Sequence, residues 1–149
     1  ELRKIIRPVC LLGPHFNYKD TIQSMLSAFT NPKIIQNCRS VLDIPNTCNI
    51  AIGAPGLSHS ERLYLGIPTV LVPQSEKHTE LCKNWHDEGC ALFAKPEPKH
   101  IACRVKELVA DHFDCARRIS ISGQGLIDGE GASRLLSELT SHRPGEYPA

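Results

Sequence analysis

The segment 49–72, NIAIGAPGLSHSERLYLGIPTVLV, constrains the fold more than any other part of this chain. Apolar runs at 50–52 and 69–72 predict two buried strands. The Gly/Pro-rich stretch 53–56 predicts a turn, and the pattern over 58–65 predicts a helix between the strands. Two strands that are joined through a helix run parallel, so this segment predicts an α/β fold.

The predicted turn is also a candidate ligand site, because it carries no bulky side chain before Leu57. We expect Ser58 to cap the helix and Glu61 to lie in its first turn. A helix N-terminus behind a glycine turn binds anions, and a carboxylate there can accept hydrogen bonds from sugar hydroxyls. This chemistry suits a nucleotide or a nucleotide sugar. The alternative is purely structural, since every strand–turn–helix unit needs small residues at the turn.

Strand and helix patterns alternate along the rest of the chain. Strands are predicted at 7–12, 33–37, 50–52, 69–72 and 91–94; helices at 19–29, 58–65, 76–88 (closed by Gly89), 100–110, 112–122 and 132–139; a short helix or turn at 43–47; and a glycine-rich break at 123–132. This alternation predicts a Rossmann-like parallel sheet with helices on both faces. We expect one nucleotide-sugar-binding domain over 1–141, followed by a tail or linker over 142–149.

Composition excludes some function classes. The formal net charge of +1 gives no electrostatic case for nucleic acid or an anionic membrane. No apolar run approaches the roughly 20 residues that span a bilayer. The odd count of 7 cysteines, with no CxxC pair, favours free thiols in a reducing cytoplasm.

A zinc site is the metal alternative that the cysteine spacing offers. Cys82, His86 and Cys90 are spaced to share a helix face, but Gly89 is expected to end that helix and no fourth ligand is evident. The sequence therefore predicts neither a metal nor a cofactor.

Four loops should gather at one edge of a single parallel sheet, at the carboxyl ends of its strands. They are 13–17, 38–44, 53–61 and 74–78. In them, His15 and His59 are expected to flank the resulting cleft. Asp128 is expected to cap the last helix, and Trp85 to pack in the core.

The order of motifs along the chain resembles a known family. Gly56-x-Ser58-x-x-Glu61 precedes 65–68 (LGIP), then 72–73 (VP) and a polar loop. This order resembles the C-terminal domain of GT-B nucleotide-sugar enzymes. The closing segment 126–134, LIDGEGASR, is similar to the end of the UDP-sugar hydrolase of pseudaminic acid biosynthesis and of related polysaccharide-biosynthesis glycosyltransferases. Pro55 and Asn49 depart from the family pattern, which usually has glycine and aspartate there.

The resemblance implies a binding site for a UDP-sugar. Glu61 would accept hydrogen bonds from the ribose, while Ser58 and the amides of Gly56 and Leu57 would face the diphosphate or sugar. The loop 13–17 would border the phosphates, and the backbone near 42–44 would contact uracil. His78 takes the place of the family's glutamine. The implied binding residues are Gly13, His15, Asn17, Leu42, Ile44, Gly56, Leu57, Ser58, Glu61 and His78.

The resemblance also implies a division of labour. In GT-B enzymes the catalytic base lies in an N-terminal domain, so no catalytic residue is predicted here and this chain alone should bind the nucleotide with little turnover. The expected partners are a UDP-sugar and an N-terminal acceptor or catalytic domain. Two alternatives stay open: a separate donor-binding subunit of a two-chain glycosyltransferase, and a degenerate domain that serves only for interaction.

Overall fold

A computed structural model describes residues 6–38, 40–44 and 48–141. The chain divides into two compact units, Glu1–Cys48 and Asn49–Ala149, and each is described by itself. The predicted single domain 1–141 spans unit 1 and most of unit 2, and its limits stay a prediction. The predicted tail 142–149 lies outside the described residues.

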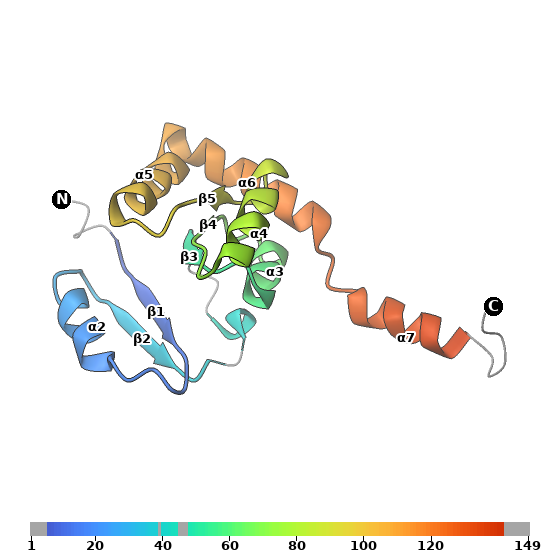
Figure 1. Ribbon diagram of the computed structural model, residues 1–149, viewed down its shortest axis with the longest axis horizontal. Coiled ribbons are helices and arrows are strands. Elements are labelled where there is room, and N and C mark those ends of the chain that lie inside the picture. The colour runs from blue at the N-terminus through green and yellow to red at the C-terminus, as the bar shows by residue number, and fades with distance from the viewer. Residues whose placement is uncertain (1–5, 39, 45–47, 142–149) are drawn as a thin grey trace. The chain divides into compact units, whose positions relative to one another are not determined.

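Unit 1 is a strand–helix–strand unit (Figure 1). Strand β1 (Val9–Leu12) pairs in parallel with β2 (Lys33–Gln36), and α2 (Lys19–Leu26) connects them. A 3-10 helix, η1 (Val41–Asp43), follows. The two predicted strands and the helix between them are confirmed, although α2 ends at Leu26 instead of residue 29. The predicted short helix or turn at 43–47 shares only residue 43 with η1, and 45–47 lie outside the described residues.

Unit 2 holds a second parallel sheet of three strands in the order β3-β4-β5. Its elements are β3 (Ala51–Gly53), α3 (Leu57–Tyr64), β4 (Thr69–Leu71), α4 (Glu76–Asp87), β5 (Leu92–Phe93), α5 (Pro98–Val109), η2 (Asp111–Phe113), α6 (Asp114–Leu126) and α7 (Gly131–Ser141). The sequence predicted one sheet, and the structure has one in each unit.

Helices cover both faces of the sheet in unit 2. Successive residues of a strand point to opposite faces, and all three residues of β4 are buried. Val70 packs in a cluster with Leu108 of α5 and Ile119 of α6, whereas Leu71 packs with Cys82 of α4. Helices α5 and α6 therefore cover one face and α4 the other, which confirms the predicted Rossmann-like architecture.

Helices α3 and α4 end in the same way, with glycine in a left-handed conformation. Gly66 has φ +66° and Gly89 has φ +69°. In each case the amide two residues after the cap bonds back to a helix carbonyl: Ile67 to Arg62, and Cys90 to Trp85. This is the Schellman motif, and glycine adopts its left-handed position without strain. The prediction that Gly89 closes α4 is confirmed.

Helix α6 overturns part of the predicted glycine-rich break. It continues to Leu126, so Gly123 and Gly125 are helical. A Cβ on Gly123 would lie 2.6 Å from Cδ2 of Leu63, and the Ser120 hydroxyl donates to the Gly66 carbonyl at 2.7 Å. The close packing of α3 on α6 leaves no room for a side chain at position 123. This packing stabilises a helix that the glycines disfavour by their local propensity.

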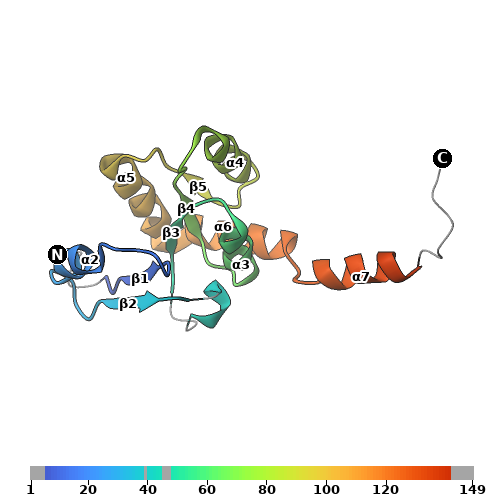
Figure 2. The ribbon, with the colours of Figure 1, turned by 60° about the horizontal axis from the view of Figure 1, so that its bottom comes forward.

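Helix α7 leads away from α6 (Figure 2), and all of its side chains are exposed. Asp128 precedes it: one carboxylate oxygen accepts from the Glu130 amide, and both oxygens accept from the Arg134 guanidinium at 2.6 and 3.2 Å. Asp128 thus has a structural role, but its backbone bond is to Glu130 before α7 begins, and it contacts the helix through Arg134 instead of capping the first amides. Among the described helices, none is long and apolar enough to cross a membrane.

Candidate functional site

The turn between β3 and α3 is the centre of the candidate site. Helix α3 begins at Leu57 with Gly56 as its N-cap, in an extended conformation with φ −121°. The prediction that Ser58 caps this helix is wrong, and Glu61 is not in the first turn, which holds no acid. The reason is that glycine is itself tolerated at an N-cap, so the helix starts before the serine.

The surface of this turn is open at the backbone. A Cβ added to Gly56 would meet nothing within 4 Å, and the side chain of Leu57 is 88% exposed. Among the described residues, no hydrogen-bond acceptor contacts the amides of Gly56 and Leu57. These are the first amides of α3, where a helix presents unpaired N–H groups and a partial positive charge. Pro55, which supplies no amide, is fully buried.

Beneath the turn lies an arginine that sequence reasoning missed. Arg62 is only 6% exposed. Its Nη2 donates to the Ala54 carbonyl at 2.9 Å, and its Nη1 to the Ser58 hydroxyl at 3.4 Å. Burial lowers the pKa of Arg62 to about 10, a shift that the nearby Glu61 partly opposes. The helical spacing gave no signal for it, because a hydrophobic pattern assigns a polar residue of α3 to the surface.

His59 belongs to the same inward face. It is 0% exposed and stacks edge-on against Trp85, with ring centroids 5.1 Å apart. Burial, and secondarily the charge of Arg62, lowers its pKa to about 4. The prediction that His59 flanks a cleft is therefore wrong, whereas the prediction that Trp85 packs in the core is confirmed by its contact with the cluster around Leu71.

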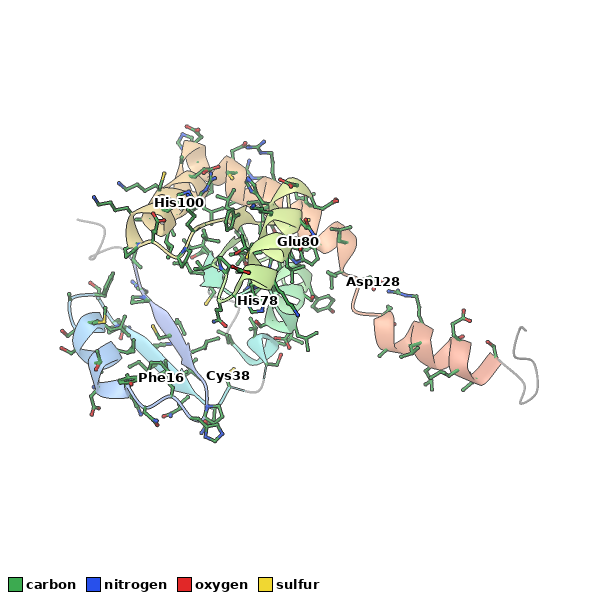
Figure 3. All side chains as sticks on the ribbon, viewed as in Figure 1. Phe16, Cys38, His78, Glu80, His100 and Asp128 are labelled. Carbon is green, nitrogen blue, oxygen red and sulfur yellow. The ribbon has the colours of Figure 1, made fainter. Side chains whose placement is uncertain are left out.

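A second loop leaves the same edge of this sheet. Gly53 is in register with Leu71, and the Val72 amide donates to the Gly53 carbonyl at 2.9 Å. The chain then reaches α4, where the Ser75 hydroxyl accepts from the His78 amide at 3.3 Å. His78 is half-buried in the first turn of α4 (Figure 3), and its Nδ1 has no hydrogen-bond partner in the described part of the chain.

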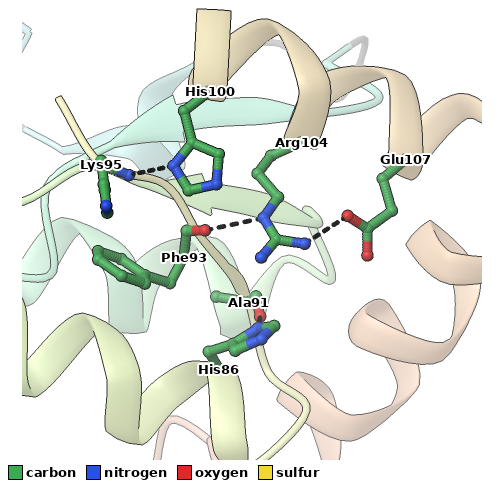
Figure 4. Close-up of polar contacts among 7 residues, drawn as sticks. All are labelled: His86, Ala91, Phe93, Lys95, His100, Arg104 and Glu107. Carbon is green, nitrogen blue, oxygen red and sulfur yellow. Dashed lines mark hydrogen bonds and ion pairs between the residues drawn. The ribbon is translucent and has the colours of Figure 1, made fainter. Parts of the chain in front are cut away.

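A third loop follows β5 and is held by α5 (Figure 4). The Arg104 guanidinium donates to the Phe93 carbonyl at 3.0 Å and to Glu107 at 2.6 Å. The Lys95 amide donates to Nδ1 of His100 at 2.9 Å, which leaves the proton of a neutral ring on Nε2. Neither Arg104 nor His100 was among the predicted site residues.

The other predicted site residues lie in unit 1. Gly13, His15 and Asn17 are exposed in the loop after β1, and the Phe16 amide closes that loop on the Gly13 carbonyl at 3.2 Å. At η1, the Leu42 amide donates to the Ser40 hydroxyl and the Ile44 amide to the Val41 carbonyl. Two amides that were candidates for contacting a base therefore already have partners.

Ten binding residues were predicted. Gly56, Leu57, Ser58, Glu61 and His78 belong to unit 2, at the N-cap of α3, in α3 and in the first turn of α4, and Gly13, His15, Asn17, Leu42 and Ile44 belong to unit 1. A site formed by both units stays a prediction. Among the described residues, no group of three His, Cys, Asp or Glu side chains could hold a metal ion, and Nδ1 of His86 instead lies 3.2 Å from the Ala91 carbonyl.

Comparisons with solved structures identify the fold. The chain superposes on the spinosyn rhamnosyltransferase SpnG, solved with thymidine diphosphate, with a TM-score of 0.63 and 18% identity, covering 91% of this chain and 36% of SpnG. It superposes on the spinosyn forosaminyltransferase SpnP with a TM-score of 0.55 and 12% identity, covering 93% of this chain and 46% of SpnP. The chain thus has the α/β, Rossmann-like fold found in GT-B glycosyltransferases.

Comparisons of sequence are consistent with that fold. Over 73 residues the chain is 32% identical to Uncharacterized protein MJ1062 of Methanocaldococcus jannaschii, covering 47% of this chain and 15% of that protein. It is 20% identical to the spore coat polysaccharide biosynthesis protein SpsG of Bacillus subtilis, covering 87% of this chain and 39% of SpsG. No family model matches. The chain spans less than half the length of each of these relatives.

Proposed function

We propose that this chain binds the diphosphate of a nucleotide sugar at the turn before α3, as the donor-binding part of a polysaccharide-biosynthesis enzyme. The observation that carries the proposal is the open N-terminus of α3, where Gly56 leaves free space and the amides of Gly56 and Leu57 have no acceptor among the described residues. Such amides bind phosphate oxygens. The likeness to SpnG, solved with thymidine diphosphate, and to SpsG supports this assignment.

In this proposal α3 and the start of α4 bind different parts of the ligand. Glu61, half-buried in the second turn of α3, accepts hydrogen bonds from the ribose of UDP. His78, in the first turn of α4, has a ring nitrogen without a partner among the described residues and can bond a phosphate or a sugar hydroxyl. For unit 1, nucleotide contacts by the loop 13–17 and by the backbone near 42–44 stay a prediction.

The chemical step requires groups from elsewhere. The chain covers 36% and 46% of the two glycosyltransferases it superposes on, so an acceptor-binding or catalytic part would come from another domain or a partner subunit. Both sugar transfer and hydrolysis of a nucleotide sugar remain compatible with a donor-binding part. The seven free cysteines support a reducing compartment, and we propose the cytoplasm.

The test is a calorimetric titration of the chain with UDP, and with TDP, CMP and GDP as competitors for selectivity. The decisive pair of variants is Gly56→Asp and Gly56→Asn. Both residues are good N-caps and have room at this position, so the helix is kept. The aspartate adds a negative charge beside the phosphates and should weaken UDP binding by about a hundredfold, while the isosteric asparagine should have a much smaller effect.

A third variant, Glu61→Gln, tests the ribose contact and should weaken UDP binding by about tenfold. If the Gly56→Asp and Gly56→Asn variants bind UDP with equal affinity, the phosphates do not bind at this turn. If the unmodified chain binds no nucleotide, the donor-binding proposal fails and the alternative of a degenerate interaction domain gains support, with the buried Pro55 marking a lost amide.

A further inference from the structure

The guanidinium of Arg62 is a buried positive charge whose hydrogen-bond acceptors are neutral. They are the Ala54 carbonyl, in the candidate turn, and the Ser58 hydroxyl, in the first turn of α3. The Nε of Arg62 is buried and has no hydrogen-bond partner in the described part of the chain. Burial of a charge without full compensation costs free energy, so such a group calls for an explanation beyond packing.

The other arginines with recorded ion pairs behave differently. Arg104 and Arg134 each donate to a carboxylate at 2.6 Å, and Arg117 and Arg118 are exposed and lie near Asp114. Among the ion pairs of the described residues, none includes Arg62. The Glu61 carboxylate supplies part of the counter-charge, because it opposes the lowering of the Arg62 pKa. An anion bound at the turn above Arg62 would add to it.

The geometry of the turn places this charge directly behind it. A Cβ on Gly53 would lie 3.0 Å from Nη1 and 3.2 Å from Cζ of Arg62. Gly53 thus lets the guanidinium pack against the backbone at the end of β3, and Nη2 then holds the Ala54 carbonyl. The amides of Gly56 and Leu57, which follow this carbonyl in the chain, have no acceptor among the described residues.

We propose that Arg62 is a positioning residue for a diphosphate: its buried charge holds the turn 53–56 and supplies the positive potential that makes the N-terminus of α3 selective for multiply charged anions. The inference deepens the proposed function and rests on it for the nucleotide. Arg62 does not contact the ligand. It acts through the turn and through an electric field that little water screens at a buried site.

A purely structural role of Arg62 predicts different changes in ligand affinity from those that a charge effect predicts. If Arg62 only stabilised the turn through its hydrogen bonds, Arg62→Gln and Arg62→Lys would weaken the binding of UDP by the same factor. A charge that acts on phosphates must weaken UDP more than UMP, and UMP more than uridine. The comparison of Arg62→Gln with Arg62→Lys therefore separates the two roles, and the ratio of the UDP and uridine affinities shows whether the loss arises at the phosphates.

The experiment titrates UDP, UMP, uridine and inorganic pyrophosphate into the full chain and four variants. Arg62→Gln removes the charge, and Arg62→Lys keeps it. Gly53→Ala leaves Arg62 in place and shifts its guanidinium slightly, because the added Cβ would lie 3.0 Å from Nη1. Arg134→Gln makes the same change in net charge at an exposed site and is the control. Circular dichroism and thermal melts verify that each variant is folded.

We expect Arg62→Gln to weaken UDP and pyrophosphate by about tenfold while uridine changes by less than about twofold. Gly53→Ala should act in the same direction, and Arg62→Lys should restore most of the affinity for both anions. Arg134→Gln should leave both unchanged. Equal losses for UDP and uridine, or anion affinity that survives Arg62→Gln, would overturn the inference.

The outcomes also separate this inference from the proposed function. If UDP binds the Arg62 variants as tightly as the unmodified chain, the proposed function is kept and the inference about Arg62 is wrong. Pyrophosphate binding that depends on Arg62, without any preference for a nucleotide, keeps the anion site and removes the nucleotide-sugar assignment. If the unmodified chain binds no pyrophosphate, the inference is wrong.

Discussion

Arg62 and Arg134 place the same side chain in opposite environments. Arg134 is exposed and forms a bidentate bond with Asp128, which raises the pKa of the arginine and lowers that of the aspartate. Arg62 is buried, has neutral acceptors, and its pKa is lowered to about 10. The first arrangement is complete within the chain and anchors the start of α7. The second is compensated only in part, which is what a site for an anion requires.

The largest expected effect is a loss of stability at low pH, caused by the histidine that is buried beside Arg62. His59 lies three residues before Arg62 on the same buried face, with a pKa of about 4 in the folded chain against 6.5 for the unfolded one. Between these values the unfolded chain holds more protons, so the free energy of unfolding falls as pH falls. We expect a loss of roughly 2 kcal/mol between pH 7 and pH 5, measured by urea unfolding.

The matched variant for this prediction is His59→Phe, which keeps an aromatic ring against Trp85 and cannot be protonated. Its unfolding free energy should vary little from pH 7 to pH 5. The Asp128–Arg134 pair should not contribute in this window, because the pKa of Asp128 is lowered from its ordinary 3.8. An equal pH dependence in His59→Phe and the unmodified chain would show that His59 is not the responsible group.

The next effect concerns the cost of burying Arg62. Methionine has a similar length and adapts to irregular space, so Arg62→Met removes the buried charge while the volume is largely filled. We expect the free energy of unfolding to rise by about 1 kcal/mol, because replacing buried charges by apolar groups is often stabilising. Arg134→Met, which breaks an exposed pair, should lower it slightly. A large loss of stability in Arg62→Met would assign Arg62 to the fold instead of to a ligand.

The same contrast shows where sequence reasoning succeeds. The strand β4 was predicted because an apolar run of this length, bounded by Pro68 and Pro73, is typical of a strand covered on both faces. The end of α4 was predicted because Gly89 adopts the left-handed conformation that a helix end needs. In both cases the signal is local to the residues concerned.

Failures occur where a distant part of the chain decides. Helix α6 runs through Gly123 because Leu63 packs against that residue, and nothing near Gly123 in the sequence indicates this contact. His59 and Arg62 are polar residues at the buried spacing of α3, so a hydrophobic pattern assigns them to the surface. The position of the candidate turn was therefore predictable, while the charge behind it required the fold.

The smallest expected effect is at the exposed pair itself. Asp128→Asn keeps an oxygen that can accept from the Glu130 amide and removes the charge that holds Arg134. Since solvent screens exposed ion pairs, we expect global stability to stay nearly unchanged and only the first turn of α7 to fray. Hydrogen exchange of the amides at 131–135 should become faster, while exchange in β4 and α4 stays the same. Faster exchange throughout unit 2 would mean that the exposed pair stabilises the whole unit, and the contrast with Arg62 would then fail.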